Sequence, residues 1–591
     1  MKRLLIYLKR HPLATLFAPL FKMLEASFEL FVPLVVAKMI DIGIYQKNAG
    51  YLWRMGALLV LLGIIGFGFA ITAQYFAAKS AVSTGRDLRN DLFAHINTLS
   101  FKEIDTLGTS TLINRMTNDV NQVQNGINMF LRLFLRSPFV VFGAMVMAFT
   151  VDVKAAIPFV IVIPALAVVV FAILLITMPL YKNVQKQLDD VLLSTRENLL
   201  GIRVVRAFNR QESEMESFEK KSLQLFFRQI HVGKISALLN PVTYVIINLG
   251  IIAILWSGGN QVYLGRLTQG QVIALINYMS QILVELIKLA NLIILLSKAI
   301  ASLNRVNNIF DMQPSIKEEG AFLASKTPIG SVAGTAAVEF SNVSFSYNEK
   351  AKEVLSNITF KAMSGQTIGI IGGTGSGKSS LVNLIPRFYD IQNGSVKVDG
   401  SNVKTLNPVS IRKHIGMVPQ KAQLFKGTLR ENMRWGRKNA TDEEIYQALE
   451  IAQAKEFVDS KDQGLDLMIE QNGSNLSGGQ RQRVWIAMAL AQNTKILLLD
   501  EPTTYLDVRY QIEILRLVKK LNTEYGITII MVLHDINQSI AYSDCIIAMK
   551  DGKILAEGNP NDVINEELIK NVYGIELSVK RIGENKVVLT V

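Results

Sequence analysis

The chain has 591 residues, half of them hydrophobic, and its mean hydropathy of +0.28 is high for a protein of this length. One hydrophobic core does not accommodate so many residues, and soluble proteins rarely carry this much apolar surface, so we expect at least two domains, one of them in a membrane. The net charge of +13 does not indicate a nucleic-acid partner, because the basic residues lie between apolar stretches, and the single cysteine, Cys545, excludes an intrachain disulfide and a cysteine-ligated metal cluster.

The first part of the chain, residues 1–311, has the pattern of a membrane domain. Its first ten residues are basic and amphipathic, which predicts a helix lying on the cytoplasmic membrane surface. Six apolar stretches that follow are long enough to cross about 30 Å of hydrocarbon. They are Leu13–Val36, Met55–Ala78, Asn128–Val151, Ala155–Leu180, Ala237–Trp256 and Val272–Leu296. We therefore predict an all-α transmembrane domain of six helices.

The links between these spans predict the topology. Spans two and three, and spans four and five, are separated by about fifty polar residues with a helical pattern that are rich in Lys and Arg. Because loops with an excess of positive charge stay in the cytoplasm, both long links and both chain termini are expected there. The predicted location is the bacterial plasma membrane, crossed several times.

The first and sixth predicted spans contain five charged residues, namely Lys22, Glu25, Glu29, Glu285 and Lys288. Ionisable groups within a span are costly and usually face a cavity or a partner. One hypothesis is structural pairing of Lys22 with Glu25 and of Glu285 with Lys288. The other starts from the count of three acids against two bases, which leaves one carboxylate unpaired and able to attract cationic or zwitterionic substrates.

The composition changes after residue 311. Residues 312–335 are small and polar with Pro and Gly, which is typical of a linker. In residues 336–591 short β-rich runs alternate with helices, as in an α/β domain. The charge changes as well, since residues 1–335 hold 32 Lys and Arg against 20 Asp and Glu, whereas residues 336–591 hold 30 against 29. We expect a soluble domain here.

A phosphate-binding loop follows the apolar strand Ile368–Ile371. Its sequence fits G-x-x-x-x-G-K-[ST] between a strand and a helix, where backbone N–H groups and the helix N-terminus converge on phosphate oxygens. We expect Lys378 to contact the β- and γ-phosphates of ATP and the Ser379 hydroxyl to bind Mg²⁺. The predicted nucleotide contacts in this segment are Gly372, Gly373, Thr374, Gly375, Ser376, Gly377, Lys378, Ser379 and Ser380.

Two acidic residues end a second apolar strand, Lys495–Leu499. Asp500 is placed to hold Mg²⁺, and Glu501, one residue further, is placed to polarise the attacking water. Beside a phosphate loop, this pair predicts nucleotide hydrolysis.

The segment Leu476-Ser477-Gly478-Gly479-Gln480 resembles the signature motif of the ATP-binding cassette (ABC) family. The resemblance implies that Ser477, Gly478, Gly479 and Gln480 do not touch the ATP of their own domain. They are expected to cap the γ-phosphate of ATP held by the opposite domain of a dimer.

Other elements of the same family occur in order along the chain. Tyr347 resembles the aromatic residue that stacks on adenine, and Gln420 resembles the glutamine that senses Mg²⁺ and contacts the membrane domain. Asp507 matches the loop that crosses the dimer interface. His534 resembles the switch histidine that contacts the γ-phosphate, so the resemblance implies that it acts in catalysis with Glu501 and Gln420.

The whole chain resembles half-transporters of the bacterial multidrug exporter type. The resemblance implies a six-helix exporter-type membrane domain fused to a C-terminal α/β P-loop NTPase domain, with coupling segments at Phe101–Ile104 and Phe208–Gln211. It also implies an ATPase that exports small amphipathic compounds such as drugs or lipids. A second half is required as partner, with a heterodimer favoured and a homodimer possible.

The sequence departs from this pattern near its end. Exporters usually read Ser-Ala-Leu-Asp where this chain has Thr504-Tyr505-Leu506-Asp507, and Val532–Gln538 and Asn571–Ile575 look more like ATPases of siderophore and cobalamin importers. An importer of metallophores built on the exporter fold is therefore the alternative. A soluble ABC-type ATPase and a gated channel are two further hypotheses; the six spans argue against the first, and the intact Glu501 argues against the second.

Overall fold

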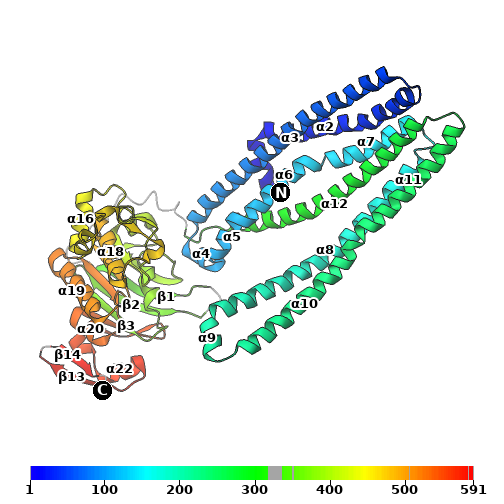
Figure 1. Cartoon of the computed structure of the whole chain (residues 1–591). Coiled ribbons are helices and arrows are strands. Elements are labelled where there is room, and N and C mark those ends of the chain that lie inside the picture. Colours follow the sequence, from blue (N-terminus) through cyan, green and yellow to red (C-terminus); the bar gives the residue numbers. More distant parts are fainter. Residues whose placement is uncertain (1, 317–335, 349–351, 505, 584, 590–591) are drawn as a thin grey trace. The chain divides into compact units, whose positions relative to one another are not determined.

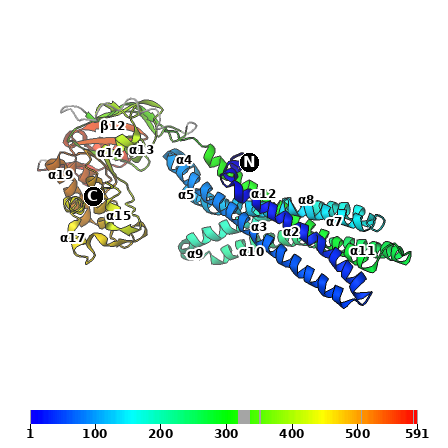
Figure 2. The same cartoon turned by 90° about the horizontal axis from the view of Figure 1, so that it is seen from above.

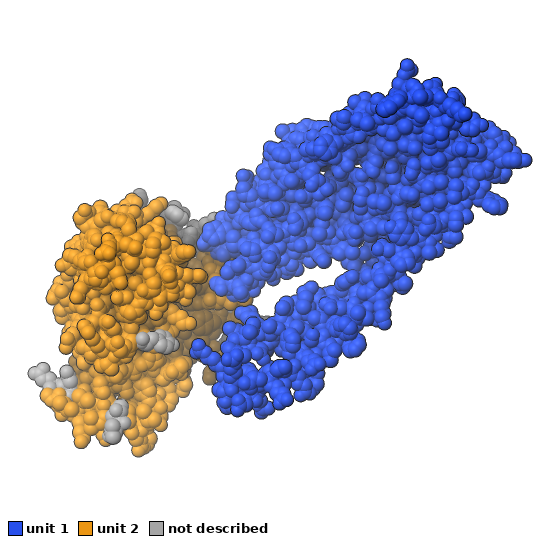
Figure 3. All heavy atoms as spheres, in the orientation of Figure 1, with its two compact units in different colours: residues 1–97, 108–312 blue, residues 98–107, 313–591 orange. Residues whose placement is uncertain are grey.

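The computed structural model describes residues 2–316, 336–348, 352–504, 506–583 and 585–589 (Figure 1). The chain divides into two compact units, which Figure 3 shows in different colours. Unit 1 comprises Met1–Asn97 and Gly108–Met312, and unit 2 comprises Thr98–Leu107 and Gln313–Val591. Most of the predicted linker, residues 317–335, lies outside the described residues.

The described residues of unit 1 form helices joined by short turns (Figure 1). Their bounds are α1 Lys2–Arg10, α2 Pro12–Lys38, α3 Ala49–Thr98, α5 Thr109–Asn114, α6 Val120–Leu133, α7 Arg136–Val151, α8 Ile157–Leu200, α9 Ile202–Ala207, α10 Gln211–Ala237, α11 Leu239–Tyr263 and α12 Gln269–Asp311, with π-helical turns η1 at Met39–Ile44 and η2 at Arg115–Asp119.

Five helical segments of unit 1 are long and apolar enough to cross a membrane. They are Ala49–Thr98, Thr109–Val151, Ile157–Leu200, Gln211–Tyr263 and Gln269–Asp311. The first predicted span forms α2, which has 27 residues but carries three charged side chains in its middle and is not among the five. The sixth span therefore stays a prediction. At 1.5 Å per residue α3 is about 75 Å long, so it exceeds the thickness of a bilayer.

Helix α12 lies at the centre of unit 1 and packs against α2, α6, α7, α8 and α11. The buried positions include many alanines, among them Ala26, Ala144 and Ala274, which allow helix backbones to approach closely. Helices α8 and α10 lie side by side with α9 at their tip, and this hairpin diverges from α6 and α12 (Figures 1 and 2). We call residues 181–237 the α8–α10 hairpin.

Unit 2 is built on a six-stranded sheet of order β12–β11–β3–β10–β9–β6, in which all strands except β12 are parallel. The predicted strands at residues 368–371 and 495–499 form β3 and β9, and β10 lies between them. Each of the three is fully buried, as apolar runs in parallel sheets are. The bounds are β3 Thr367–Gly372, β6 Ile415–Val418, β9 Ile496–Asp500, β10 Thr528–Val532, β11 Cys545–Lys550 and β12 Lys553–Gly558.

A second, antiparallel sheet of order β2–β1–β4–β5 comprises β1 Ala336–Phe345, β2 Leu355–Met363, β4 Asn393–Val398 and β5 Ser401–Asn402. A two-stranded sheet pairs β7 Gly427–Thr428 with β8 Met468–Ile469, and a hairpin pairs β13 Ser578–Ile582 with β14 Asn585–Leu589. The helices of unit 2 are α4 Phe101–Leu107, α13 Lys378–Leu384, α14 Pro408–His414, α15 Leu429–Met433, α16 Asp442–Ile451, α17 Lys455–Asp459, α18 Gly478–Ala491, α19 Val508–Tyr525, α20 Ile536–Tyr542, α21 Pro560–Val563 and α22 Glu566–Tyr573, with 3-10 turns at Gly464–Asp466 and Gln471–Gly473.

Helix α4 belongs to unit 2 although the long helix that precedes it belongs to unit 1. The ring of Phe101 lies 4.7 Å from that of Phe388, and the hydroxyl of Tyr389 donates to Asp105 at 2.6 Å. The first predicted coupling segment therefore packs with the sheet domain. The second, at residues 208–211, lies at the turn between α9 and α10 in unit 1.

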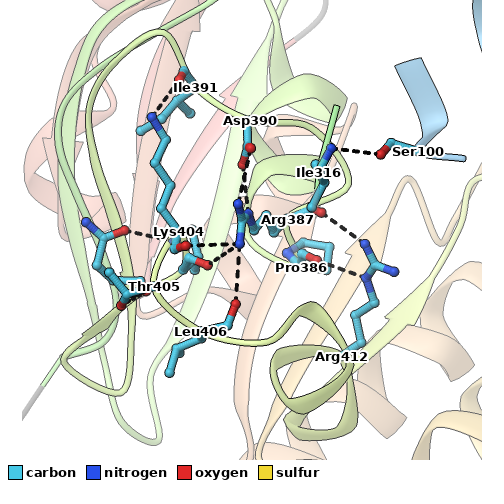
Figure 4. A network of polar contacts seen from close by, with 12 residues as sticks. Ser100, Ile316, Pro386, Arg387, Asp390, Ile391, Lys404, Thr405, Leu406 and Arg412 are labelled. Carbon is cyan, nitrogen blue, oxygen red and sulfur yellow. Dashed lines mark hydrogen bonds and ion pairs between the residues drawn. The ribbon is translucent and has the colours of Figure 1, made fainter. Parts of the chain in front are cut away.

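A polar network supports the surface on which α4 lies (Figure 4). The backbone N–H of Ile316 donates to the Ser100 hydroxyl at 3.1 Å. The buried guanidinium of Arg387 binds Asp390 through two nitrogens at 2.7 and 3.2 Å, and it also donates to the carbonyl oxygens of Val403, Lys404 and Leu406. These bonds fix the turn that presents Phe388 and Tyr389 to α4.

Candidate functional site

The predicted nucleotide residues gather at one edge of the central sheet. Strand β3 leads into the phosphate loop, β9 ends in Asp500 and is followed by Glu501, and β10 is followed by His534 after one residue. Gln420 follows β6 two residues after its end. Because these strands are parallel, their carboxyl ends meet at the same edge, where ligands bind in open α/β sheets.

The phosphate loop is closed around its own lysine. Lys378 is 5% exposed, and its Nζ donates to the carbonyl oxygens of Gly372 at 2.8 Å and Gly373 at 2.9 Å. Burial lowers the pKa of Lys378, although the nearby Glu501 and Asp500 oppose this. Gly377 has φ of +95°, and a Cβ there would lie 2.7 Å from the Leu355 side chain, so the loop requires glycine at this position.

The loop also contains a buried hydroxyl, that of Ser376, whose hydrogen-bonding capacity is unused: it has no hydrogen-bond partner among the described residues. A buried polar atom of this kind needs a partner, and a phosphate oxygen is a suitable one. Helix α13 begins at Lys378 directly after this loop, so its N-terminal N–H groups are available to the same ligand.

Ser379 and Asp500 form an oxygen pair next to the loop. The Ser379 hydroxyl donates to Asp500 Oδ1 at 3.0 Å. Burial raises the pKa of Asp500, and the Ser379 bond partly offsets this rise. Hydroxyl and carboxylate oxygens suit Mg²⁺, which takes only one or two protein ligands when phosphates and waters complete its shell. No group of three His, Cys, Asp or Glu side chains in the described part of the chain is arranged to hold a metal by itself.

Glu501 is held by three side chains. His534 Nε2 bonds one carboxylate oxygen at 2.7 Å, and the other oxygen accepts from Gln420 Nε2 at 2.7 Å and from the Thr504 hydroxyl at 3.1 Å. Burial by itself would raise the pKa of Glu501, but the bond and charge of His534 and the bonds from Gln420 and Thr504 outweigh it and hold the pKa below its ordinary value.

The backbone of Glu501 is strained, with φ of 51°. A side chain other than glycine rarely adopts this conformation, and such positions cluster at functional sites. The strained turn directs the carboxylate toward the loop side of the sheet, where His534 and Gln420 meet it. Glu501, His534 and Gln420, predicted from separate motifs, thus form one cluster.

The signature residues are not part of that cluster. Ser477 caps α18 in a capping box, accepting from Gln480 N at 3.2 Å while the Gln480 side chain accepts from Ser477 N at 3.0 Å. Asp507 likewise caps α19 by accepting from Tyr510 N. In the described residues no hydrogen bond joins 477–480 or Asp507 to the phosphate loop, which agrees with a motif that serves another domain.

Tyr347 lies beside the first turn of α13. Its hydroxyl bonds the Ser380 hydroxyl at 2.9 Å, and its ring meets the edges of Phe345 and Tyr389 at centroid distances of 4.9 and 5.1 Å. The side chain is 42% exposed, which leaves part of the ring free to stack on a base.

A second charged cluster lies in unit 1, on α2, α7 and α12. Arg136, 6% exposed, donates to Glu285 at 2.5 Å and to Glu29 at 2.6 Å. Glu285 also accepts from Ser137 at 2.9 Å and from Lys288 at 2.8 Å. We call these five side chains the membrane cluster. Arg136 connects three helices, because its two partners lie on different ones.

This cluster corrects the expectation of an unpaired carboxylate. The predicted pairs Lys22–Glu25 and Glu285–Lys288 are present, at 2.5 and 2.8 Å. Arg136 is a third base, however, and it pairs with Glu29. Each of the three acids therefore has a basic partner, so the prediction of an unpaired carboxylate was wrong.

Sequence reasoning missed Arg136 and Thr504 as functional partners. Arg136 lay inside the predicted third span, so counting every charged residue within the spans would have found it. Thr504 had a weaker signal, a hydroxyl three residues after Glu501 that reaches back across one turn.

Comparisons with known proteins agree with this arrangement. Residues 15–286 match the family described as ABC transporter transmembrane region, and residues 355–504 match the one described as ABC transporter. An ABC transporter ATP-binding protein of Bacillus subtilis, YfiB, is 33% identical over 574 residues, which cover 97% of this chain and 98% of that protein. An ATP-dependent lipid A-core flippase of Desulfotalea psychrophila is 30% identical over 91% of this chain and 91% of its own length.

Among solved structures, a bacterial Atm1-family ABC exporter with ATP bound aligns with a TM-score of 0.75. The alignment covers 95% of this chain and 96% of that one, at 22% sequence identity. At this identity the likeness shows a shared fold across both units.

Proposed function

The chain belongs to the ABC transporter family and is an ATP-hydrolysing half-transporter of the exporter type, and from this we propose that two halves pair in the bacterial plasma membrane and export small amphipathic compounds such as drugs or lipids. The observation that carries the proposal is the cluster of Glu501, His534 and Gln420 beside the phosphate loop. The termini and unit 2 lie in the cytoplasm, where ATP is available.

Each residue of the site has a proposed role. Lys378 leaves the carbonyl oxygens of its own loop and binds the β- and γ-phosphates, and the free Ser376 hydroxyl and the loop N–H groups bind phosphate oxygens. Ser379 and Asp500 hold Mg²⁺, which when bound neutralises charge on the phosphates. Tyr347 stacks on adenine.

Glu501 polarises the attacking water as an ionised carboxylate that accepts a hydrogen bond from it. His534 and Gln420 are now bonded to that carboxylate, and on ATP binding they turn to the γ-phosphate and Mg²⁺. The Thr504 hydroxyl remains as a partner of the Glu501 carboxylate, and the attacking water takes the place of the two that leave.

A second half completes the transporter. Ser477–Gln480 and Asp507 have their backbone donors at helix N-termini away from their own loop, and these are the surfaces offered to a partner domain. In unit 1 the α8–α10 hairpin exposes large apolar side chains, an unfavourable surface for a protein without a partner. More than half exposed there are Leu199, Leu200, Phe208, Met215, Phe226 and Phe227.

Export is supported by the exporter fold of the solved relative and by the flippase among the sequence relatives. The test is transport in sealed vesicles of known orientation, with a panel of dyes, lipids and metallophores. We expect ATP-dependent movement of amphipathic compounds away from the side that carries unit 2, and none with Glu501→Gln. Movement of a metallophore toward unit 2 would instead establish the importer alternative.

A further inference from the structure

The C-terminal hairpin β13–β14 packs on the face of the sheet that carries the switch helix α20. Val588 of β14 is 3% exposed and lies in one apolar cluster with Ile540 of α20 and Ile371 of β3. Strand β14 also contacts α21, and the Lys586 ammonium donates to the carbonyl oxygen of Ile564 at 2.7 Å. The hairpin is thus a packed part of unit 2.

One side chain joins α20 directly to this hairpin. Asn537 Nδ2 donates to the carbonyl oxygen of Val588 at 3.0 Å, and Asn537 Oδ1 accepts from Val588 N at 2.8 Å. The amide satisfies both backbone groups of one residue on the outer edge of β14, as a neighbouring strand would. Two hydrogen bonds in one plane fix the orientation of Asn537 and the start of α20.

The start of α20 lies next to the switch position. His534 is three residues before Asn537, and Asp535 caps α20 by accepting from Gln538 N at 2.9 Å. The other side of α20 is held by a bond from Gln538 to Gln511 of α19 at 2.7 Å. His534 itself is about half exposed, and within the described residues it bonds Glu501. Its backbone position therefore depends on how firmly α20 is held.

We propose that Asn537 is a positioning residue for ATP hydrolysis, which holds α20 against the C-terminal hairpin and so keeps His534 within reach of Glu501 and the γ-phosphate. The inference rests on the role proposed for His534. A displacement of about 1 Å at a catalytic group lowers a rate by about a hundredfold, so a loosened α20 acts on turnover. The bonds of Asn537 do not involve the phosphate loop, so the change should act on turnover more than on ATP binding.

The test compares full-length variants reconstituted in lipid. Asn537→Ala removes both bonds to Val588, and Asn537→Asp keeps the acceptor but sets a carboxylate against a carbonyl oxygen. We expect kcat for ATP to fall by about tenfold in both, while KM stays within about twofold. Lys586→Met is the matched control, because it removes a hairpin bond to Ile564 and leaves the bonds of Asn537 intact. It should keep kcat within about twofold.

A double-mutant cycle with His534→Ala separates positioning from general loss of structure. If Asn537 acts through His534, Asn537→Ala should have no further effect on kcat in the His534→Ala background. Equal effects in both backgrounds, or a larger change in KM than in kcat, would overturn the inference. A normal kcat for His534→Ala alone would instead overturn the role of His534 on which it rests.

Discussion

Two regions of this protein bury a carboxylate among hydrogen-bond donors, and they hold it in different ways. In unit 2, Glu501 is bound by a histidine, an amide and a hydroxyl on a strained backbone. In unit 1, Glu285 is bound by a guanidinium, an ammonium and a hydroxyl on a regular helix. An ion pair with a half-exposed partner, such as His534, is released at less cost than the buried pair of Arg136 and Glu285. The first arrangement suits exchange during turnover, and the second suits permanent structure.

The largest expected effect separates binding from chemistry at Glu501. Glu501→Gln keeps the shape and the hydrogen bonds but removes the charge that polarises water. Hydrolysis should fall by about a hundredfold or more, while binding of a non-hydrolysed ATP analogue remains. Lys378→Ala is the contrasting variant, since it should weaken analogue binding. If Glu501→Gln hydrolyses ATP at the wild-type rate, Glu501 is not the catalytic carboxylate.

Substitutions in the membrane cluster should lower the stability of the protein and should not act on the chemistry of ATP hydrolysis. Arg136→Met leaves Glu285 and Glu29 without their shared cation, and breaking a buried pair in this way costs about 3 kcal/mol. Thermal unfolding in lipid should show the loss, and Glu285→Gln added to Arg136→Met should recover part of it. Surface Lys220→Ala is the control. If the Arg136→Met protein is as stable as wild type, the membrane cluster is not a permanent structural contact.

A smaller effect concerns substrate charge. Because each of the three acids in the spans has a basic partner, Glu29→Gln should change stimulation of ATPase by cationic and by neutral amphiphiles to the same degree. The measurement is the ratio of the two stimulations in wild type and variant. A selective loss for cations would show that Glu29 contacts substrate despite its bond to Arg136.

The smallest effect is the pH dependence of stability at Glu501. Its folded pKa is held below the ordinary 4.5, so the ionised form stabilises the fold at pH values above that figure. This contribution is lost as the pH falls through the folded pKa. The difference in thermal stability between wild type and Glu501→Gln should therefore shrink from about pH 6 to about pH 3. A constant difference would contradict the depressed pKa.

Residues that act within a few positions of each other were predictable from the sequence. The phosphate loop, Asp500 and Glu501 lie in short patterns whose geometry follows from a strand end and a helix start. The resemblance gave Gln420 a role beside Glu501 in catalysis, but no strand order was predicted, and the bond between the two side chains is known from the structure. The left-handed backbone of Glu501 was not indicated by any local signal.

Contacts between distant segments were not predictable. Arg136 and Glu285 are 149 positions apart, and Asn537 and Val588 are 51 apart. The sequence shows that a buried charge or amide needs a partner, but the choice among candidates depends on how the helices pack. For the same reason the sequence did not show that α4 would pack with unit 2 while α3 belongs to unit 1.

The bond between Asn537 and Val588 has a practical consequence for anyone who purifies this protein. Both bonds of Asn537 are made to the backbone of Val588 in β14. A tag or fluorescent fusion joined directly to β14 therefore acts on the helix that follows His534. ATPase rates from preparations with and without such a tag are not interchangeable.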